Sequence, residues 1–277
     1  MVIRNFNLMD SSEIQIFVEG EEDNIFYNWL LFDIINKNFR NGIRIESCGG
    51  KGCQKIIASM ARGRKKFIIT DRDYQFLGKS NYPTHTEEIL KAAASNSLTK
   101  VKEEKELTII QLFPTELENL FFLIALEKEF EKLKEFIEEK REKLIAFTLL
   151  RCATSLCKKA KKELDISIKS CNEKEVLRNL LNGNIFLSED QRNRLRYFKN
   201  LLVGLELKEL CFLIAGKETR KLLEKTPGNP VGKVLKNLGF NINQPNIPRS
   251  DKDAYKKGSS EILDKLRTEI LEILGGS

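Results

Sequence analysis

Up to residue 114, short apolar runs alternate with amphipathic stretches, which predicts strands alternating with helices. Four runs have the length of buried strands: Ile14–Val18, 43–46, 65–70 and 106–114. Residues 23–35 carry apolar side chains at helical spacing, and a glycine loop at 48–52 opens another short helix. This order is typical of a parallel α/β sheet flanked by helices, in which ligands gather at the carboxyl ends of the strands.

Beyond residue 115 the pattern changes to helix formers with interleaved Glu and Lys. We expect residues 125–210 to be all helical, with Asn172 and Ser188 as N-caps because Glu175 and Gln191 follow at capping-box spacing. A last helix is expected at 259–274. The predicted division of the chain is a core at 10–124, a helical insertion at 125–210 and a return to the core at 211–277.

The composition predicts a soluble, cytoplasmic protein. The 277 residues are 41% hydrophobic and 31% charged, and the apolar runs are too short to span a bilayer. The N-terminus lacks the apolar block of a secretory signal. The six cysteines are expected as free thiols, and their spacing does not favour structural zinc. The net charge of +7 favours an acidic partner, of which nucleic acid is the commonest.

The single histidine, His85, narrows the chemistry that the chain can perform. It lies in a turn-like stretch beside Pro83, so catalysis by a histidine base next to Ser or Cys has one poor candidate. We expect any chemistry to depend on carboxylates, lysines and a metal ion.

Acidic residues follow two of the predicted strands. Glu19 follows the first strand, and Asp71 and Asp73 follow the third. Since carboxyl ends of parallel strands meet at one edge of a sheet, these carboxylates should converge there and repel one another. A hard divalent cation relieves this repulsion, and Mg²⁺ prefers oxygen ligands. Alternation along an extended backbone would direct Arg72 away from the two aspartates, toward a phosphate.

The motifs "VEGEED" and "IITDRD", each at a strand end and about fifty residues apart, resemble the two signature positions of the TOPRIM domain. Three further stretches, "ESCGGKG", "PTELENLFF" and "AGKETRKLL", are similar to the pattern of OLD-like TOPRIM nucleases with an inserted helical region. TOPRIM effectors of PARIS phage-defence systems, which partner an ABC-type ATPase, are built in this way. The resemblance covers residues 19–223 as scattered short motifs.

The resemblance implies a metal site and a set of ligands. Glu19, Asp71 and Asp73 would be catalytic metal ligands, with Asp23 and Glu118 in support. The metal would be Mg²⁺, or Mn²⁺, and would activate a water for attack on a phosphodiester bond.

The resemblance also implies how nucleic acid is bound and cut. Lys217 would offset charge that develops on the scissile phosphate, and Lys51 and Arg72 would contact the nucleic acid. The implied activity is that of a toxic anti-phage nuclease that cuts host RNA such as tRNA, is controlled by an ABC-type ATPase and forms a homodimer. The alternative is a non-catalytic TOPRIM module that binds nucleic acid or protein.

Each candidate residue also has an ordinary structural interpretation. The acids at 19, 71 and 73 could be turn residues at strand ends, and Asp23 could only start a helix. Glu118 could form a capping box with Thr115. Lys217 lies in a plain helix start, and the glycine loop at 49–52 could be a tight turn or a backbone nest for a phosphate.

Overall fold

The computed structural model describes residues 14–31, 42–61, 65–157, 173–182, 187–225, 228–238 and 260–276. The chain divides into two compact units. The first unit consists of Met1–Thr70, Leu98–Leu112 and Leu235–Ser277, and the second of Asp71–Ser97 and Phe113–Val234. The helical unit therefore includes residues 71–97, 113–124 and 211–234, which the sequence pattern had placed with the sheet. Asn172, an expected N-cap, lies outside the described residues.

The first unit is built on a five-stranded sheet with the order β2-β1-β3-β5-β4. Its strands are β1 (Ile14–Val18), β2 (Ile43–Ser47), β3 (Lys65–Thr70), β4 (Thr99–Glu104) and β5 (Leu107–Leu112). The pairs β1–β2, β1–β3 and β3–β5 are parallel, and β4 runs antiparallel to β5 at the edge. The α/β class and the four expected strands are confirmed, and β4 is an additional strand.

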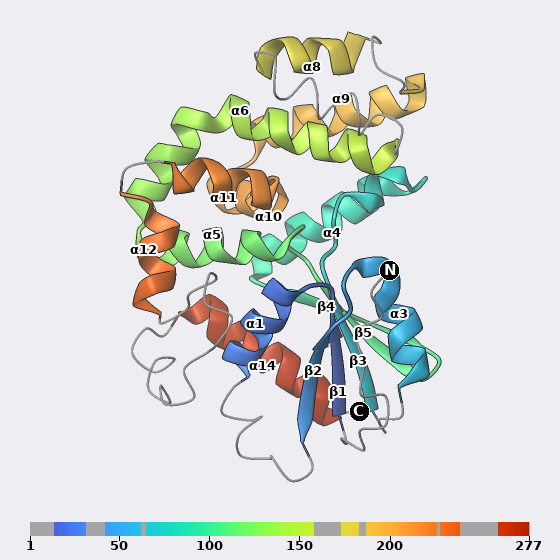
Figure 1. Cartoon of the computed structure of the whole chain (residues 1–277). Helices are drawn as coiled ribbons and strands as arrows, with labels where there is room; N and C mark the ends of the chain where they lie inside the picture. The colour runs from blue at the N-terminus through green and yellow to red at the C-terminus, as the bar shows by residue number, and fades with distance from the viewer. Residues whose placement is uncertain are drawn as a thin grey trace. The chain divides into compact units, whose positions relative to one another are not determined.

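Helices cover both faces of the sheet. On one face, α3 (Lys51–Met60) packs Ala58 against Phe17 and Ile68 in a cluster of buried side chains. On the other face lie α1 (Glu21–Leu30) and α14 (Glu261–Gly276), as Figure 1 shows. The central strands are apolar on both faces because both are covered. On α14, Glu269 accepts a hydrogen bond from Thr99 Oγ1 (2.8 Å) and so holds the start of β4.

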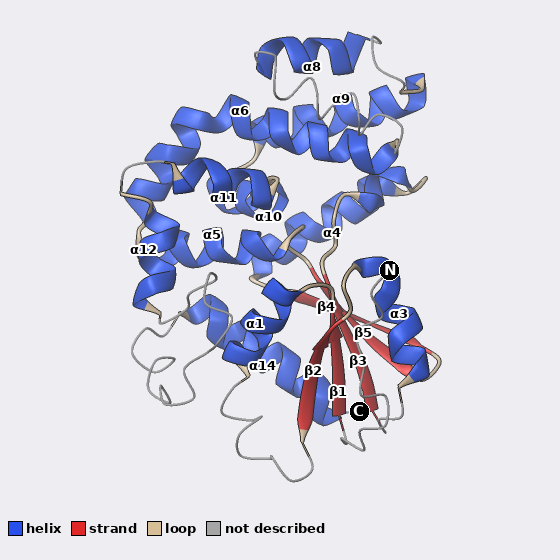
Figure 2. Cartoon of the chain, in the orientation of Figure 1, coloured by secondary structure: helices blue, strands red, loops and turns tan. Residues whose placement is uncertain are grey.

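The described regular elements of the second unit are all helices, and the described strands all belong to the sheet of the first unit (Figure 2). Its helices are η1 (Gln75–Gly78), α4 (Tyr82–Ser95), α5 (Leu117–Lys128), α6 (Phe130–Leu156), α8 (Glu173–Asn182), α9 (Glu189–Gly204), α10 (Leu207–Leu213), α11 (Gly216–Glu224) and the start of α12 (Pro230–Asn237). The long helix α6 packs against α5, α8 and α9. The predicted capping box at Ser188 and Gln191 is confirmed, with reciprocal bonds of 3.2 and 2.9 Å.

No helix within the described ranges is long and apolar enough to cross a bilayer.

Two glycines make the turn between β2 and α3 possible. Gly49 has φ +70°, and Gly50 has φ +138° with ψ 152°, a region that essentially only glycine occupies. In this conformation Gly50 donates its N–H to the carbonyl of Glu19 (2.8 Å), and Cys48 N–H reaches Val18 O (3.0 Å). The loop therefore fixes the backbone where β1 ends.

We expect Gly50→Ala to destabilise the protein by about 1–3 kcal/mol, because a side chain strains this backbone conformation. The control is Gly52→Ala in the first turn of α3, where nothing lies within 4 Å of an added Cβ and alanine favours the helix. Urea unfolding of both variants measures the difference. Equal unfolding midpoints for the two variants would contradict this account of the loop.

Candidate functional site

Glu19 and Asp71 follow neighbouring parallel strands. The β1–β3 register pairs Phe17 with Ile68, so its continuation brings Glu19 level with Thr70, the residue before Asp71. Both residues thus come directly after the carboxyl ends of adjacent strands, as the sequence predicted. Glu19 is half-buried, and Asp71 is 8% exposed.

Asp23 has a structural role at the start of α1. Its Oδ2 accepts a hydrogen bond from Gly20 N–H (3.0 Å), which caps the helix. This contact agrees with the simpler interpretation of Asp23 as a helix-start residue. Asp23 is therefore a weaker candidate ligand than Glu19.

Asp73 adopts a left-handed backbone conformation, with φ +50°. Its N–H donates to the carbonyl of Thr115 (2.8 Å), and the hydroxyl of the next residue, Tyr74, donates to Leu213 O (2.8 Å). Non-glycine residues in this conformation are uncommon, although Asp tolerates it better than most. The segment that follows β3 is thus anchored firmly within the helical unit.

Arg72 lies inside the helical unit and not on its surface. The residue is only 5% exposed, and its guanidinium forms an ion pair with Glu88 (3.0 Å) and contacts His85 Nδ1 (3.2 Å). The rings of Phe76 and Phe113 lie within 6 Å of the guanidinium carbon. An arginine buried in this way does not offer the phosphate contact that the sequence suggested. For Lys51, the other predicted nucleic-acid contact, the side chain lies outside the described part of the structure.

The alternative interpretation of Glu118, a capping box with Thr115, is wrong because the helix start falls one residue later. Glu116 is the N-cap of α5, and its N–H donates to Asn119 Oδ1 (2.9 Å). The Thr115 hydroxyl instead donates to the carbonyl of Phe212 (3.2 Å). Helix capping therefore does not account for Glu118.

Glu118 is a buried carboxyl group with an unsatisfied oxygen. The residue is 2% exposed, and its Oε2 has no hydrogen-bond partner. Burial raises the pKa of Glu118 to about 7; the positive charge of Lys217 opposes this rise, and the negative charge of Glu116 adds to it. Its ion pair with Arg220 is a loose one, with 3.7 Å between the guanidinium nitrogen and Glu118 Oε1. Buried acids with shifted pKa values are enriched at functional sites.

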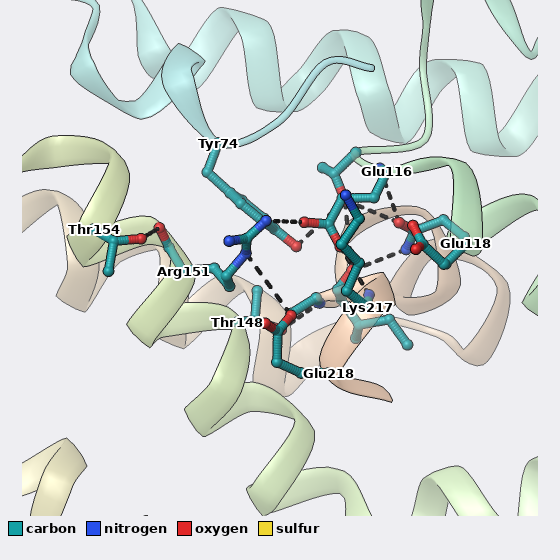
Figure 3. A network of polar contacts seen from close by, with 12 residues as sticks. Tyr74, Glu116, Glu118, Thr148, Arg151, Thr154, Lys217 and Glu218 are labelled. Carbon is teal, nitrogen blue, oxygen red and sulfur yellow. Dashed lines mark hydrogen bonds and ion pairs between the residues drawn. The ribbon is translucent and has the colours of Figure 1, made fainter. Parts of the chain in front are cut away.

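Lys217 and Glu118 lie beside each other in a network that also contains Glu116 and Arg151 (Figure 3). Glu116 Oε1 accepts a hydrogen bond from Arg151 on α6 (2.7 Å), and its Oε2 accepts one from the backbone N–H of Lys217 on α11 (3.0 Å). Sequence reasoning identified Glu118 and Lys217 but missed Glu116 and Arg151. The alternation of acids in "TELEN" was the one available signal, and nothing marked Arg151 within the helical segment.

Among the described residues, no group of three or more His, Cys, Asp or Glu side chains could hold a metal ion. The carboxylates expected as ligands therefore do not form a preassembled three-ligand site in the structure. Individual oxygen donors are nevertheless present at the two strand ends and at Glu118. Mg²⁺ binds oxygen ligands of this kind, and it commonly takes only one or two carboxylates from the protein.

No protein-family model matches the chain, and no curated protein matches its sequence significantly.

We expect metal-free Glu118→Gln to be more stable than the wild type at pH 8. The folded-state pKa of about 7 exceeds the ordinary 4.5, so below pH 4.5 the buried Glu118 is protonated in both states and costs no stability. As the pH rises from 4.5 to 7, the free energy of unfolding of the wild type falls, because the acid ionises more easily in the unfolded chain. Glutamine removes that loss, which is on the order of 3 kcal/mol. The measurement is thermal unfolding in a chelator at pH 5 and pH 8. A stability difference that is the same at both pH values would contradict the shifted pKa.

Proposed function

We propose that the chain is a Mg²⁺-dependent nuclease that hydrolyses phosphodiester bonds. The observation that carries the proposal is the pairing of β1 with β3: these parallel neighbours are followed directly by Glu19 and by Asp71-x-Asp73. Carboxylates that follow adjacent parallel strands are oxygen ligands that a divalent cation can share. The net charge of +7 suits a polyanionic substrate.

The residues fit a magnesium ion by their chemistry. Glu19, Asp71 and Asp73 offer only oxygen atoms, and Mg²⁺ needs one or two carboxylates because it retains several waters. When bound, the metal would supply an activated water and neutralise phosphate charge. Within the helical unit, Lys217 supplies a fixed positive charge for the phosphate oxygens, and Glu118 accepts a proton near neutral pH.

We expect the purified protein to cut RNA or DNA in Mg²⁺ or Mn²⁺, and Glu19→Gln and Asp71→Asn to lower the rate by at least 100-fold. Both changes keep the side-chain shape while removing the charge that binds the metal. Glu22→Gln, at an exposed acid three residues beyond Glu19, is the control and should cut like the wild type. Full cleavage by the Glu19 and Asp71 variants would rule out their role.

The substrate and the control of the enzyme are proposed from the resemblance to PARIS effectors alone. By that resemblance the target is host RNA such as tRNA, and an ABC-type ATPase restrains the nuclease until phage infection. Homodimerisation is proposed on the same basis.

In cells, expression of the wild type without a partner should arrest growth, whereas Glu19→Gln should not. Loss of intact tRNA before growth stops, followed on northern blots, would identify the substrate. Arrest by both proteins would show that the toxicity does not depend on cleavage.

A second candidate is a non-catalytic module that binds nucleic acid or protein. The observation that favours it is the absence of a preassembled three-ligand group among the described side chains. Calorimetry with Mg²⁺ separates the candidates: binding that Glu19→Gln abolishes supports the nuclease, and no heat supports the module.

A further inference from the structure

The carboxylate of Glu116 joins three helices of the second unit. Glu116 is 1% exposed and stands at the N-cap of α5. Its two oxygens accept hydrogen bonds from Arg151 of α6 (2.7 Å) and from the backbone N–H of Lys217 (3.0 Å). Figure 3 shows these bonds meeting on one side chain. A single buried carboxylate thus sets where the first turn of α11 begins relative to α5 and α6.

The first turn of α11 is held closely on both sides. A Cβ added to Gly216 would come within 2.9 Å of Asn119 Oδ1 and 3.0 Å of Glu118 Cβ, so the backbone of α11 approaches α5 as only glycine allows. The preceding residue, Ala215, donates its N–H to Thr148 Oγ1 of α6 (2.9 Å). Lys217 therefore extends from a backbone that has little freedom to shift.

The charge on Glu116 is balanced within the network. Arg151 compensates it directly and also faces Glu218 at 3.8 Å. A negative charge beside the first N–H groups of α11 is favoured by the helix dipole. Glu116 therefore stabilises the α11 start through two effects, a hydrogen bond and a charge at the helix N-terminus.

We propose that Glu116, held by Arg151, is a positioning residue: its carboxylate fixes the first turn of α11 and so places Lys217 next to Glu118. This inference rests on the proposed nuclease activity, in which Lys217 faces the phosphate. In this proposal Glu116 and Arg151 have no contact with the substrate or the metal. They act through the backbone of Lys217.

The first test compares cleavage kinetics. Glu116→Gln keeps the side-chain size but removes the charge, and we expect kcat to fall roughly 10- to 100-fold while KM stays unchanged, because the lysine is displaced from the reacting phosphate. Glu206→Gln is the matched control, since Glu206 is the exposed N-cap of α10 in the same unit. It should cut like the wild type.

A double-mutant cycle separates positioning from general stability. In a Lys217→Ala background, followed as single turnovers with enzyme in excess, adding Glu116→Gln should slow cleavage no further. If Glu116→Gln slows both backgrounds by the same factor, its effect does not pass through Lys217, and the inference is overturned.

Amide hydrogen exchange tests the placement without relying on activity. Glu116→Ala should speed exchange of the Lys217 amide at least tenfold, while amides in the middle of α6 exchange as in the wild type. Unchanged Lys217 exchange would overturn the inference even in an active enzyme. If the wild type cuts no nucleic acid, the proposed function is wrong, and the exchange rates alone decide whether Glu116 holds α11.

Discussion

The helical unit depends on the burial of one carboxylate, Glu116. An ionised acid removed from water costs several kcal/mol unless hydrogen bonds and an opposite charge compensate it. The compensation comes from Arg151, 35 residues along the chain, and from the N–H of Lys217, 101 residues along. Because these partners belong to α6 and α11, the carboxylate at the start of α5 is compensated only when both helices pack around it. One local electrostatic requirement therefore links elements that are distant in sequence.

The same region holds the backbone that leads out of β3. Asp73 bonds to the carbonyl of Thr115, and the N–H of Thr115 bonds in turn to the carbonyl of Phe212 (2.9 Å). On the following turn, Asn119 Nδ2 donates to the carbonyls of Cys211 (2.6 Å) and Ile214 (2.9 Å). The three segments thus form a continuous hydrogen-bonded network within the helical unit. The conformation of Asp73, which is unusual for a residue other than glycine, is maintained by these bonds.

The sequence predicted the strands well because burial on both faces leaves long apolar runs, as in Ile14–Val18. It missed β4, whose "TKVKEE" reads as a charged stretch because an edge strand exposes most of its side chains. It misplaced the helix start at Thr115, since a Thr hydroxyl can cap a helix or bond to a distant carbonyl, and only the fold decides which. The Glu116–Arg151 pair could not be predicted, because no local pattern relates two residues on separate helices.

The buried carboxyl groups of Glu116 and Glu118 differ in how many of their oxygens are hydrogen-bonded. Glu116 has a hydrogen bond to each oxygen, whereas Glu118 leaves Oε2 without one although it is equally buried. Glu218 Oε2, in the same network, also lacks a hydrogen-bond partner, and buried unsatisfied groups of this kind are uncommon in folded proteins. Glu118 is also the acid that lies beside Lys217. A water or a cation is the kind of partner that completes such an oxygen, and the hydrogen bonds of Glu116 hold the backbone around it in place.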